Sequence, residues 1–350
     1  MSAGEASNYE YVIARVRARR AALFSEEDYR KLLRMGPGEI ARFMEESTYE
    51  REINALGSRH DGVDLIEYAL NADLAQQFND LLRWAEGRLY EQIVRYLRKF
   101  DAWNAKTVLR GLYADADAET IEDDLIPAGE LGEDRLAAML ETDSIEAAIA
   151  ELSGTIFDTP LEEAFPDYES SGLLVPLENA IDRAYYKNLL VGIPDAEQGP
   201  SALYREFLEA EIDFRNVRNA LRIARSGADI DPAEYFIEGG QLFDAGEMAG
   251  LAANMDELVE RLRESTYGDR LEDAIVELEE ADSLVEFEHA VEAALLEYSE
   301  TLSNRYPLSV CPVLAYVLAK EREVDNIRAI ARGREAGLDA EEIESDLVIL

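Results

Sequence analysis

Apolar side chains recur at three- and four-residue steps along most of the chain, which is the period of an amphipathic helix. The first such stretch runs from Tyr9 to Phe24, and Ser25 followed by three acids is a helix N-cap signal. Sustained alternation with a period of two is absent apart from a short ambiguous tail at 347–350. The sequence therefore predicts a nearly all-α fold. Further helices are expected at 65–113 (a hairpin or one bent helix), 136–152, 177–190, 202–225, 255–262, 271–280, 285–302 and 313–332.

Loop-like clusters rich in Gly, Pro, Ser and Asp interrupt this pattern. The stretch 158–172 also reads as a loop. Two of the clusters divide the chain into helical units of similar length, predicted at 1–113, 114–227 and 228–350, and such a division is typical of an internal repeat. The clusters lie at 57–62, 114–118, 127–132, 192–201 and 226–232.

A short pattern occurs once in each predicted unit. It consists of an acid, an Asn three residues later, a base two residues after the Asn and an Arg four residues after that base. The three Asn residues are 112 and 110 residues apart. Upstream, Glu46-Ser47-Thr48-Tyr49 recurs as Glu264-Ser265-Thr266-Tyr267 and more weakly as Ser153-Gly154-Thr155-Ile156. This regularity predicts three copies of one helical unit. The pattern comprises Asp101, Asn104, Lys106 and Arg110; Asp213, Asn216, Arg218 and Arg222; and Glu323, Asn326, Arg328 and Arg332.

A helical wheel separates the polar members of this pattern into two groups. At about 100° per residue, the acid falls within the apolar arc and the Asn lies at its edge. A buried polar side chain needs hydrogen-bond partners, so these residues are expected to join the repeat core. The expected core residues are Asp101, Asn104, Asp213, Asn216, Glu323 and Asn326.

The two bases of each copy fall on the opposite side of the wheel, and two interpretations of them stay open. They could form a solvated face near a helix C-terminus, where cations interact favourably with the helix dipole. Alternatively, three copies could form a positive ring that suits an acidic partner protein. The candidate interface consists of Lys106, Arg110, Arg218, Arg222, Arg328 and Arg332.

Composition narrows the classes of function. Across 350 residues, 75 acidic and 34 basic side chains give a net charge of −41, which argues against binding to nucleic acid or to an anionic membrane surface. Because 47% of the residues are hydrophobic, the chain should nevertheless fold. Abundant acids with scarce lysine suit a cytoplasm at multi-molar salt, where the Debye length falls to about 3 Å and self-repulsion is screened. The composition therefore predicts a halophilic origin.

Residues for catalysis, metals or cofactors are not arranged in recognisable motifs. Neither common phosphate-binding glycine spacing occurs, and His60 and His289 are far apart. Cys311 is the single cysteine and lies among apolar neighbours, so it should be a packed thiol in a cytosolic protein. Asp115, Asp117, Asp123 and Asp124 are typical of a solvated acidic loop in so acidic a chain. We therefore expect no cofactor or metal and no catalytic residues.

Membrane insertion is also not expected. The most apolar stretch, 308–319, is about 12 residues long, whereas a membrane-spanning helix needs about 20. The first six residues lack the basic start and apolar core of a signal peptide.

The C-terminal segment Pro307–Gly333, PLSVCPVLAYVLAKEREVDNIRAIARG, closely resembles the signature of the C subunits of archaeal A-type (V/A-type) ATP synthases, the relatives of the V-ATPase d subunits. The opening residues Asn8–Val12, Ala14–Arg17 and Ser25–Tyr29 resemble the N-terminus of the same family. Length and helical repetition agree with this resemblance over essentially the whole chain. The second unit departs from it most, at 158–172 and at the weak Ser-Thr copy.

This resemblance implies a mechanical role without a catalytic site. Members of the family are funnel-shaped helical rotor proteins on the cytoplasmic side of the membrane. They are seated on the proteolipid ring, receive the foot of the central stalk and couple proton-driven rotation to ATP synthesis. Two rivals remain at this point. A generic helical-repeat scaffold would share the periodicity but not the signature, and a carboxylate-dependent enzyme would need a pocket with perturbed acids.

Overall fold

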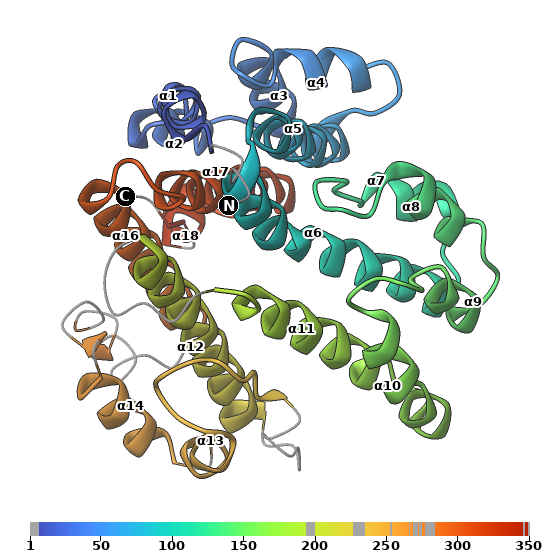
Figure 1. Cartoon of the computed structure of the whole chain (residues 1–350). Coiled ribbons are helices and arrows are strands. Elements are labelled where there is room, and N and C mark those ends of the chain that lie inside the picture. Colours follow the sequence, from blue (N-terminus) through green and yellow to red (C-terminus); the bar gives the residue numbers. More distant parts are fainter. Residues whose placement is uncertain are drawn as a thin grey trace. The chain divides into compact units, whose positions relative to one another are not determined.

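The structure is a computed structural model that describes residues 7–193, 200–226, 235–252, 254–265, 267–268, 272, 275–276, 284–345 and 347–348. Every regular element in these ranges is a helix, so the all-α prediction is confirmed (Figure 1). Most of the helix expected at 271–280 lies outside the described residues. The 17 helices of the described ranges are α1 (Tyr9–Arg20), α2 (Glu26–Leu32), α3 (Pro37–Glu45), α4 (Glu50–Leu56), α5 (Gly62–Trp84), α6 (Gly87–Tyr113), α7 (Ala118–Asp123), α8 (Glu133–Leu140), α9 (Ile145–Ala150), α10 (Asp158–Ser171), α11 (Val175–Leu190), α12 (Pro200–Ser226), α13 (Ala245–Ala252), α14 (Met255–Arg263), α16 (Leu284–Arg305), α17 (Cys311–Ala336) and α18 (Ala340–Ser345).

The described residues fall into two compact units. The first spans Met1–Val12 and Ala41–Val191, and the second spans Ile13–Ile40 and Gly192–Leu350. A compact unit is defined by packing and a repeat by sequence, so these two units do not test the three predicted repeats. The triplication stays a prediction.

The first unit is organised around the α5–α6 hairpin, which is the hairpin alternative for 65–113. Asn8 stabilises the turn between the two helices, because its Nδ2 donates to the Trp84 carbonyl (2.7 Å) and its Oδ1 accepts from the Glu86 amide (3.0 Å). Gly87 opens α6 with φ of +57°, a value that favours glycine. Helix α6 packs against α11, and α11 in turn packs against α10 (Figure 1).

In the second unit, α16 packs against both α12 and α17, and α13 packs against α12 and α14. The short helix α2, from the N-terminal part of the chain, packs against α17 in the same unit. Large side chains such as Tyr204, Phe207 and Tyr316 are at most 1% exposed. Cys311 is likewise buried in α17, and burial raises the pKa of its thiol.

Two sequence expectations are wrong in the first unit. Residues 158–172 are not a loop: they form α10, which ends at Gly172 in the left-handed conformation (φ 68°). Pro166 lies inside this helix. A proline in a helix interior usually marks a break, but α10 continues through it and packs against α11. The helix expected over 136–152 is two helices, α8 and α9, because Ser144 adopts an N-cap conformation and its Oγ accepts from the Ala147 amide (3.1 Å).

Candidate functional site

The recurring Asn residues lie on the buried faces of the long helices and are at most 3% exposed. Each makes two hydrogen bonds to the backbone of one later residue, donating one and accepting the other. The side-chain Nδ2 donates to that residue's carbonyl and Oδ1 accepts from its amide. One side chain thus satisfies both backbone groups of a segment that returns to the long helix without forming a strand or helix there. The pairs are Asn104 with Ile126 (2.8 and 2.8 Å), Asn216 with Ile237 (2.8 and 2.9 Å) and Asn326 with Val348 (2.8 and 3.1 Å).

The acid of the first copy anchors the same returning segment a few residues later. Asp101 is 2% exposed and accepts hydrogen bonds from the backbone amides of Glu130 (2.9 Å) and Leu131 (2.8 Å). Burial raises the pKa of Asp101 to about 6, and the two amide hydrogen bonds oppose that rise. Gly129 permits this approach, because a Cβ there would overlap the Asp101 carboxylate.

The acid of the second copy has the same arrangement with one addition. Asp213 accepts from the amides of Gln241 (2.9 Å) and Leu242 (2.9 Å), and Gly240 again leaves room for its carboxylate. The Tyr267 hydroxyl donates a further hydrogen bond to Asp213 Oδ2 (2.9 Å). Burial raises the pKa of Asp213, opposed by these three donors.

The acid of the third copy, Glu323, has different partners. It is 2% exposed, accepts from the backbone amide of Phe24 and pairs with the Lys320 Nζ at 2.8 Å. Lys320 is itself only 1% exposed, so this is a buried ion pair. No sequence signal pointed to a residue 299 positions earlier as a partner of this acid.

The bases of the first copy form ion pairs with α11 inside the first unit. Lys106 Nζ lies 2.5 Å from Asp182 Oδ1, and Arg110 Nε lies 2.6 Å from Glu178 Oε1. The two bases are four residues apart on α6 and the two acids four apart on α11, a complementary spacing that the sequence-based prediction missed. Arg110 remains 52% exposed at its side chain while it is paired.

In the second unit, arginines from two helices form ion pairs with one carboxylate on α16. Arg218 of α12 and Arg322 of α17 both contact Glu292, at 2.9 and 2.7 Å. One carboxylate thus links three helices. Arg328 pairs within α17 with Asp325, at 3.1 Å.

The last two candidate interface residues give less information. Arg332 is exposed on α17, and the side chain of Arg222 lies outside the described part of the chain. At least four of the six candidate bases therefore form internal ion pairs. Their role in binding a partner stays a prediction.

A turn formed by Ser or Thr before a buried aromatic residue occurs three times. It shows that the predicted alignment of the second copy, at 153–156, is wrong by one residue. In each, the hydroxyl donates to the carbonyl three residues earlier and accepts from the amide of the aromatic residue two positions later. Thr155 therefore corresponds to Ser47, and Phe157 corresponds to Tyr49, one residue away from the expected alignment. The turns are Ser47 with Tyr49, Thr155 with Phe157, and Ser265 with Tyr267.

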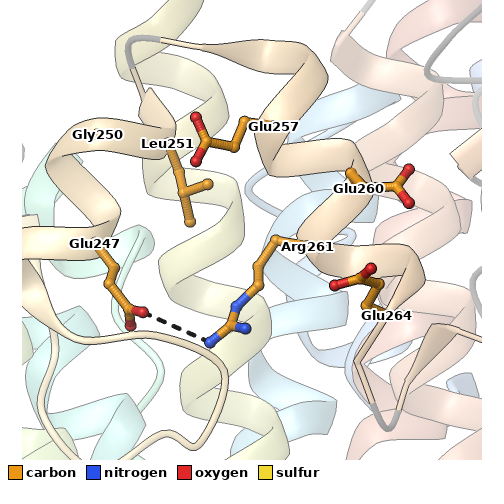
Figure 2. Close-up of a pocket in the computed structure, with 7 residues that line it drawn as sticks. All are labelled: Glu247, Gly250, Leu251, Glu257, Glu260, Arg261 and Glu264. Atoms are coloured by element: carbon orange, nitrogen blue, oxygen red, sulfur yellow. Dashed lines mark ion pairs between the residues drawn. The ribbon is translucent and has the colours of Figure 1, made fainter.

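Helices α13 and α14 border an open groove of about 350 Å³ (Figure 2). Arg261 lies in its centre, 3.7 Å from Glu247, and its guanidinium donates to the Leu242 carbonyl at 3.0 and 3.2 Å. Glu257 and Glu264 line the same groove, and a neighbouring cavity of about 220 Å³ reaches Tyr267. The buried acids Asp101 and Asp213 line neither cavity. The polar lining of the groove therefore consists mainly of glutamate side chains around Arg261, which is paired with Glu247.

The described residues include no group of three or more His, Cys, Asp or Glu side chains arranged to hold a metal ion. Within the same residues, no helix is long and apolar enough to cross a membrane. His60 stacks edge-on against Tyr68, with ring centroids 4.6 Å apart.

Comparison with known proteins gives matches over the full chain. The model of the ATP synthase (C/AC39) subunit family matches residues 12–346. The A-type ATP synthase C subunit of Haloferax volcanii is 65% identical over 350 residues, covering 100% of both chains. The protein of the same name from Halobacterium salinarum is 62% identical, again with 100% of both chains covered. That of Methanosarcina mazei is 34% identical and covers 98% of this chain and 94% of the relative.

Proposed function

The chain belongs to the ATP synthase (C/AC39) subunit family, and on that premise we propose that it couples the central stalk of an A-type ATP synthase to the membrane proteolipid ring. It is the C subunit, a non-catalytic part of that complex. The observation that carries this function is the 65% identity to a C subunit over the whole of both chains. The relatives from halophilic archaea also agree with the acidic, lysine-poor composition.

A torque-transmitting adaptor must be stiff, and the contacts inside each unit favour stiffness. The Asn and acid side chains tie returning segments to α6, α12 and α17 through buried hydrogen bonds. Ion pairs tie α6 to α11 and link α12, α16 and α17 through Glu292. Partly buried, multiply bonded pairs are screened less by salt than isolated surface pairs, so these links should persist at high ionic strength.

The finer arrangement belongs to the same proposal. Three helical units, 1–113, 114–227 and 228–350, would form a pseudo-three-fold funnel with one end for the stalk and the other for the ring. The chain would then be a peripheral protein on the cytoplasmic face of the cell membrane, active during proton-driven ATP synthesis. The spacing of 112 and 110 residues between the repeated Asn residues supports three equivalent units.

The repeated bases are the proposed contact with a partner. Arg110 is half exposed while it is paired with Glu178, so its guanidinium can still bind a second carboxylate from an acidic partner. Arg332 is exposed in the third copy. Arg110 would then join its internal ion pair with Glu178 to an intermolecular one.

Charge removal at the repeat tests this interface. A variant with Arg218, Arg222, Arg328 and Arg332 replaced by Gln should lose attachment to stalk or ring proteins several-fold while its helicity is unchanged. One control removes the same charge from exposed positions elsewhere, through Gln at Arg30, Arg59, Arg83 and Arg263. A second control, Glu292→Gln, breaks the internal ion pair of Arg218 while every base is kept, and it should assemble as the wild type does. Unchanged assembly of the first variant in multi-molar KCl would refute the interface.

The function itself is tested by isolating the complex. The tagged chain is purified from membranes solubilised in mild detergent at multi-molar KCl, and the co-purifying chains are identified by mass spectrometry. Central-stalk and proteolipid subunits should be recovered in constant proportion to the tagged chain. A folded chain recovered without them would contradict the proposal.

A further inference from the structure

The N-terminal part of the second unit carries an excess of positive charge. Between Ile13 and Arg34 the chain has seven basic and three acidic side chains, a net charge of +4, whereas the whole chain has a net charge of −41. Most of this excess belongs to α1, which contains no acid after Glu10. Helix α1 is therefore a basic helix on an acidic protein. Its four bases are Arg15, Arg17, Arg19 and Arg20.

Packing fixes the orientation of α1 within the second unit. Ile13 and Val16 are at most 2% exposed, so they hold one side of the helix in the core. Arg20, the last residue of α1, pairs with Glu300 of α16. Because these contacts keep the inner side of α1 in place, the opposite side of the helix faces solvent.

The solvent side of α1 presents bases and no acids. Arg15 and Arg17 are exposed there, and Arg19 is half-buried at its border. The exposed positions beside them are Ala14 and Ala18, which offer no carboxylate. Arg17 forms no ion pair within the part of the chain that the structure describes. Its guanidinium can therefore bind a carboxylate from outside.

Other bases of the chain are matched internally. At least four of the six repeat bases form ion pairs within their own unit. In α2, Arg30 pairs with Glu26 and Lys31 pairs with Glu27. By contrast, α1 has four bases and the single acid Glu10, so the helix cannot neutralise itself.

We propose that the solvent side of α1, with Arg15, Arg17 and Arg19, is the docking surface for a carboxylate-rich helix of the central stalk. This proposal rests on the proposed function and names a surface for one of its two partners. Arginine suits such a partner, because its planar guanidinium binds a carboxylate through two parallel hydrogen bonds. Direct pairs of this kind persist in about 1 M salt, whereas exposed charges more than about 3 Å apart are screened from one another.

The sign of the charge distinguishes the stalk from the ring. The stalk is a soluble assembly in the same cytoplasm, and the acidic composition of this chain and its halophilic relatives indicate a cytoplasm that favours acidic protein surfaces. The cytoplasmic loops of membrane proteins instead carry an excess of Lys and Arg. Such loops would repel the arginines of α1, so this helix is complementary to the stalk and not to the ring.

High salt also argues against lipid and nucleic acid as the partner. An amphipathic helix binds a lipid surface through its apolar side, but Ile13 and Val16 are already buried in the protein. Attraction between the arginines and anionic headgroups falls off within a Debye length. Binding to nucleic acid weakens steeply as salt rises, because it depends on counterion release. An acidic protein surface is the partner that the charge and packing of α1 favour.

Recovery of stalk proteins with the tagged full-length chain tests this docking. Membranes are solubilised in mild detergent at multi-molar KCl, and the co-purifying chains are quantified by mass spectrometry. The variant with Arg15→Gln, Arg17→Gln and Arg19→Gln should recover about 10-fold less stalk protein than the wild type, with proteolipid recovery unchanged. Arg17→Glu alone should lower stalk recovery several-fold and leave the circular dichroism spectrum unchanged, and it decides the question if the triple variant does not fold.

The matched control removes three exposed bases that each pair with an acid of their own helix. It combines Arg30→Gln, Lys31→Gln and Arg263→Gln and should recover stalk and proteolipid as the wild type does. Flotation of the wild-type chain with phosphatidylglycerol vesicles in multi-molar KCl is the test for lipid, and we expect no flotation.

Four results would overturn the docking. They are stalk recovery in the α1 variants equal to that of the control, an equal loss of stalk and proteolipid, a loss of proteolipid alone, and flotation with vesicles that the α1 substitutions abolish. In each of these cases a wild-type chain that recovers both partners would leave the proposed function standing. A wild-type chain recovered without stalk and proteolipid would contradict the proposed function, and the docking with it.

Discussion

Replacing Gly129 by Ala should destabilise the first unit by about 3 kcal/mol, because the new Cβ would occupy the space of the Asp101 carboxylate. That carboxylate is buried and bound by the amides of Glu130 and Leu131. It therefore cannot rotate away from the methyl group and keep both hydrogen bonds. Either the bonds break or the segment held by Asp101 moves off α6.

The magnitude follows from these two alternatives. Overpacking a filled site costs about 1–3 kcal/mol. Losing one hydrogen bond to a charged group costs about 1.5–3 kcal/mol. If a hydrogen bond breaks, the carboxylate can move and the overpacking is partly relieved, so the two costs do not add in full. We therefore expect a loss of about 3 kcal/mol in total.

Urea unfolding followed by circular dichroism in multi-molar KCl measures this change. Gly132→Ala is the matched control, because a Cβ there meets no atom within 4 Å and its φ of −67° suits any residue. The control should lose no more than about 1 kcal/mol, because Gly132 is the N-cap of α8 and Ala is a poorer N-cap than Gly. If Gly129→Ala unfolds at the same urea concentration as Gly132→Ala, the steric role of the Asp101 contact is wrong.

Three further predictions concern the same core. The pKa of Asp101 is about 6 in the folded chain, above its unfolded value, so the protonated form stabilises the fold. This stabilisation is complete below about pH 4 and is lost as the pH rises to about 6, at about 1.4 kcal/mol per pH unit. Asp101→Asn should remove that part of the pH profile of urea unfolding, and an unchanged profile would contradict the prediction. Asn326→Leu should lower stability by about 2–4 kcal/mol, because both buried Val348 hydrogen bonds are lost; a wild-type melting curve would show that Asn326 is not a core residue. Tyr267→Phe should cost about 1 kcal/mol through the lost bond to Asp213, measured by the same urea titration, and an equal midpoint would disprove that bond's contribution.

Helical periodicity allowed much of the architecture to be predicted from the sequence. The wheel indicated which arc of the repeat helix faces inward, and Asp101, Asn104 and their equivalents lie in the core. Periodicity fails where local signals and packing disagree. Pro166 suggested a loop, but α10 continues through it against α11, whereas Ser144 divides an apolar stretch that looked continuous.

The partners of these residues could not be predicted, because they depend on contacts distant in sequence. Nothing in the sequence indicates that the Phe24 amide binds Glu323, since a backbone donor leaves no residue-type signal. Gly129 lay in the loop-like stretch 127–132 and Gly240 lay outside every expected helix, so neither could be told from an ordinary turn glycine. The ion pairs of Lys106 and Arg110 left a weak signal, the matching four-residue spacing of Asp182 and Glu178.

Coupling of the stalk to the ring is the function proposed for this chain, and removing the chain from the complex tests it. Inverted membrane vesicles are prepared from cells that lack the chain, and ATP synthesis driven by an imposed proton gradient is measured before and after the purified chain is added. We predict that ATP synthesis is absent without the chain, although the catalytic head still hydrolyses ATP, and that adding the chain restores synthesis. Synthesis at the wild-type rate in vesicles without the chain would contradict the proposed coupling.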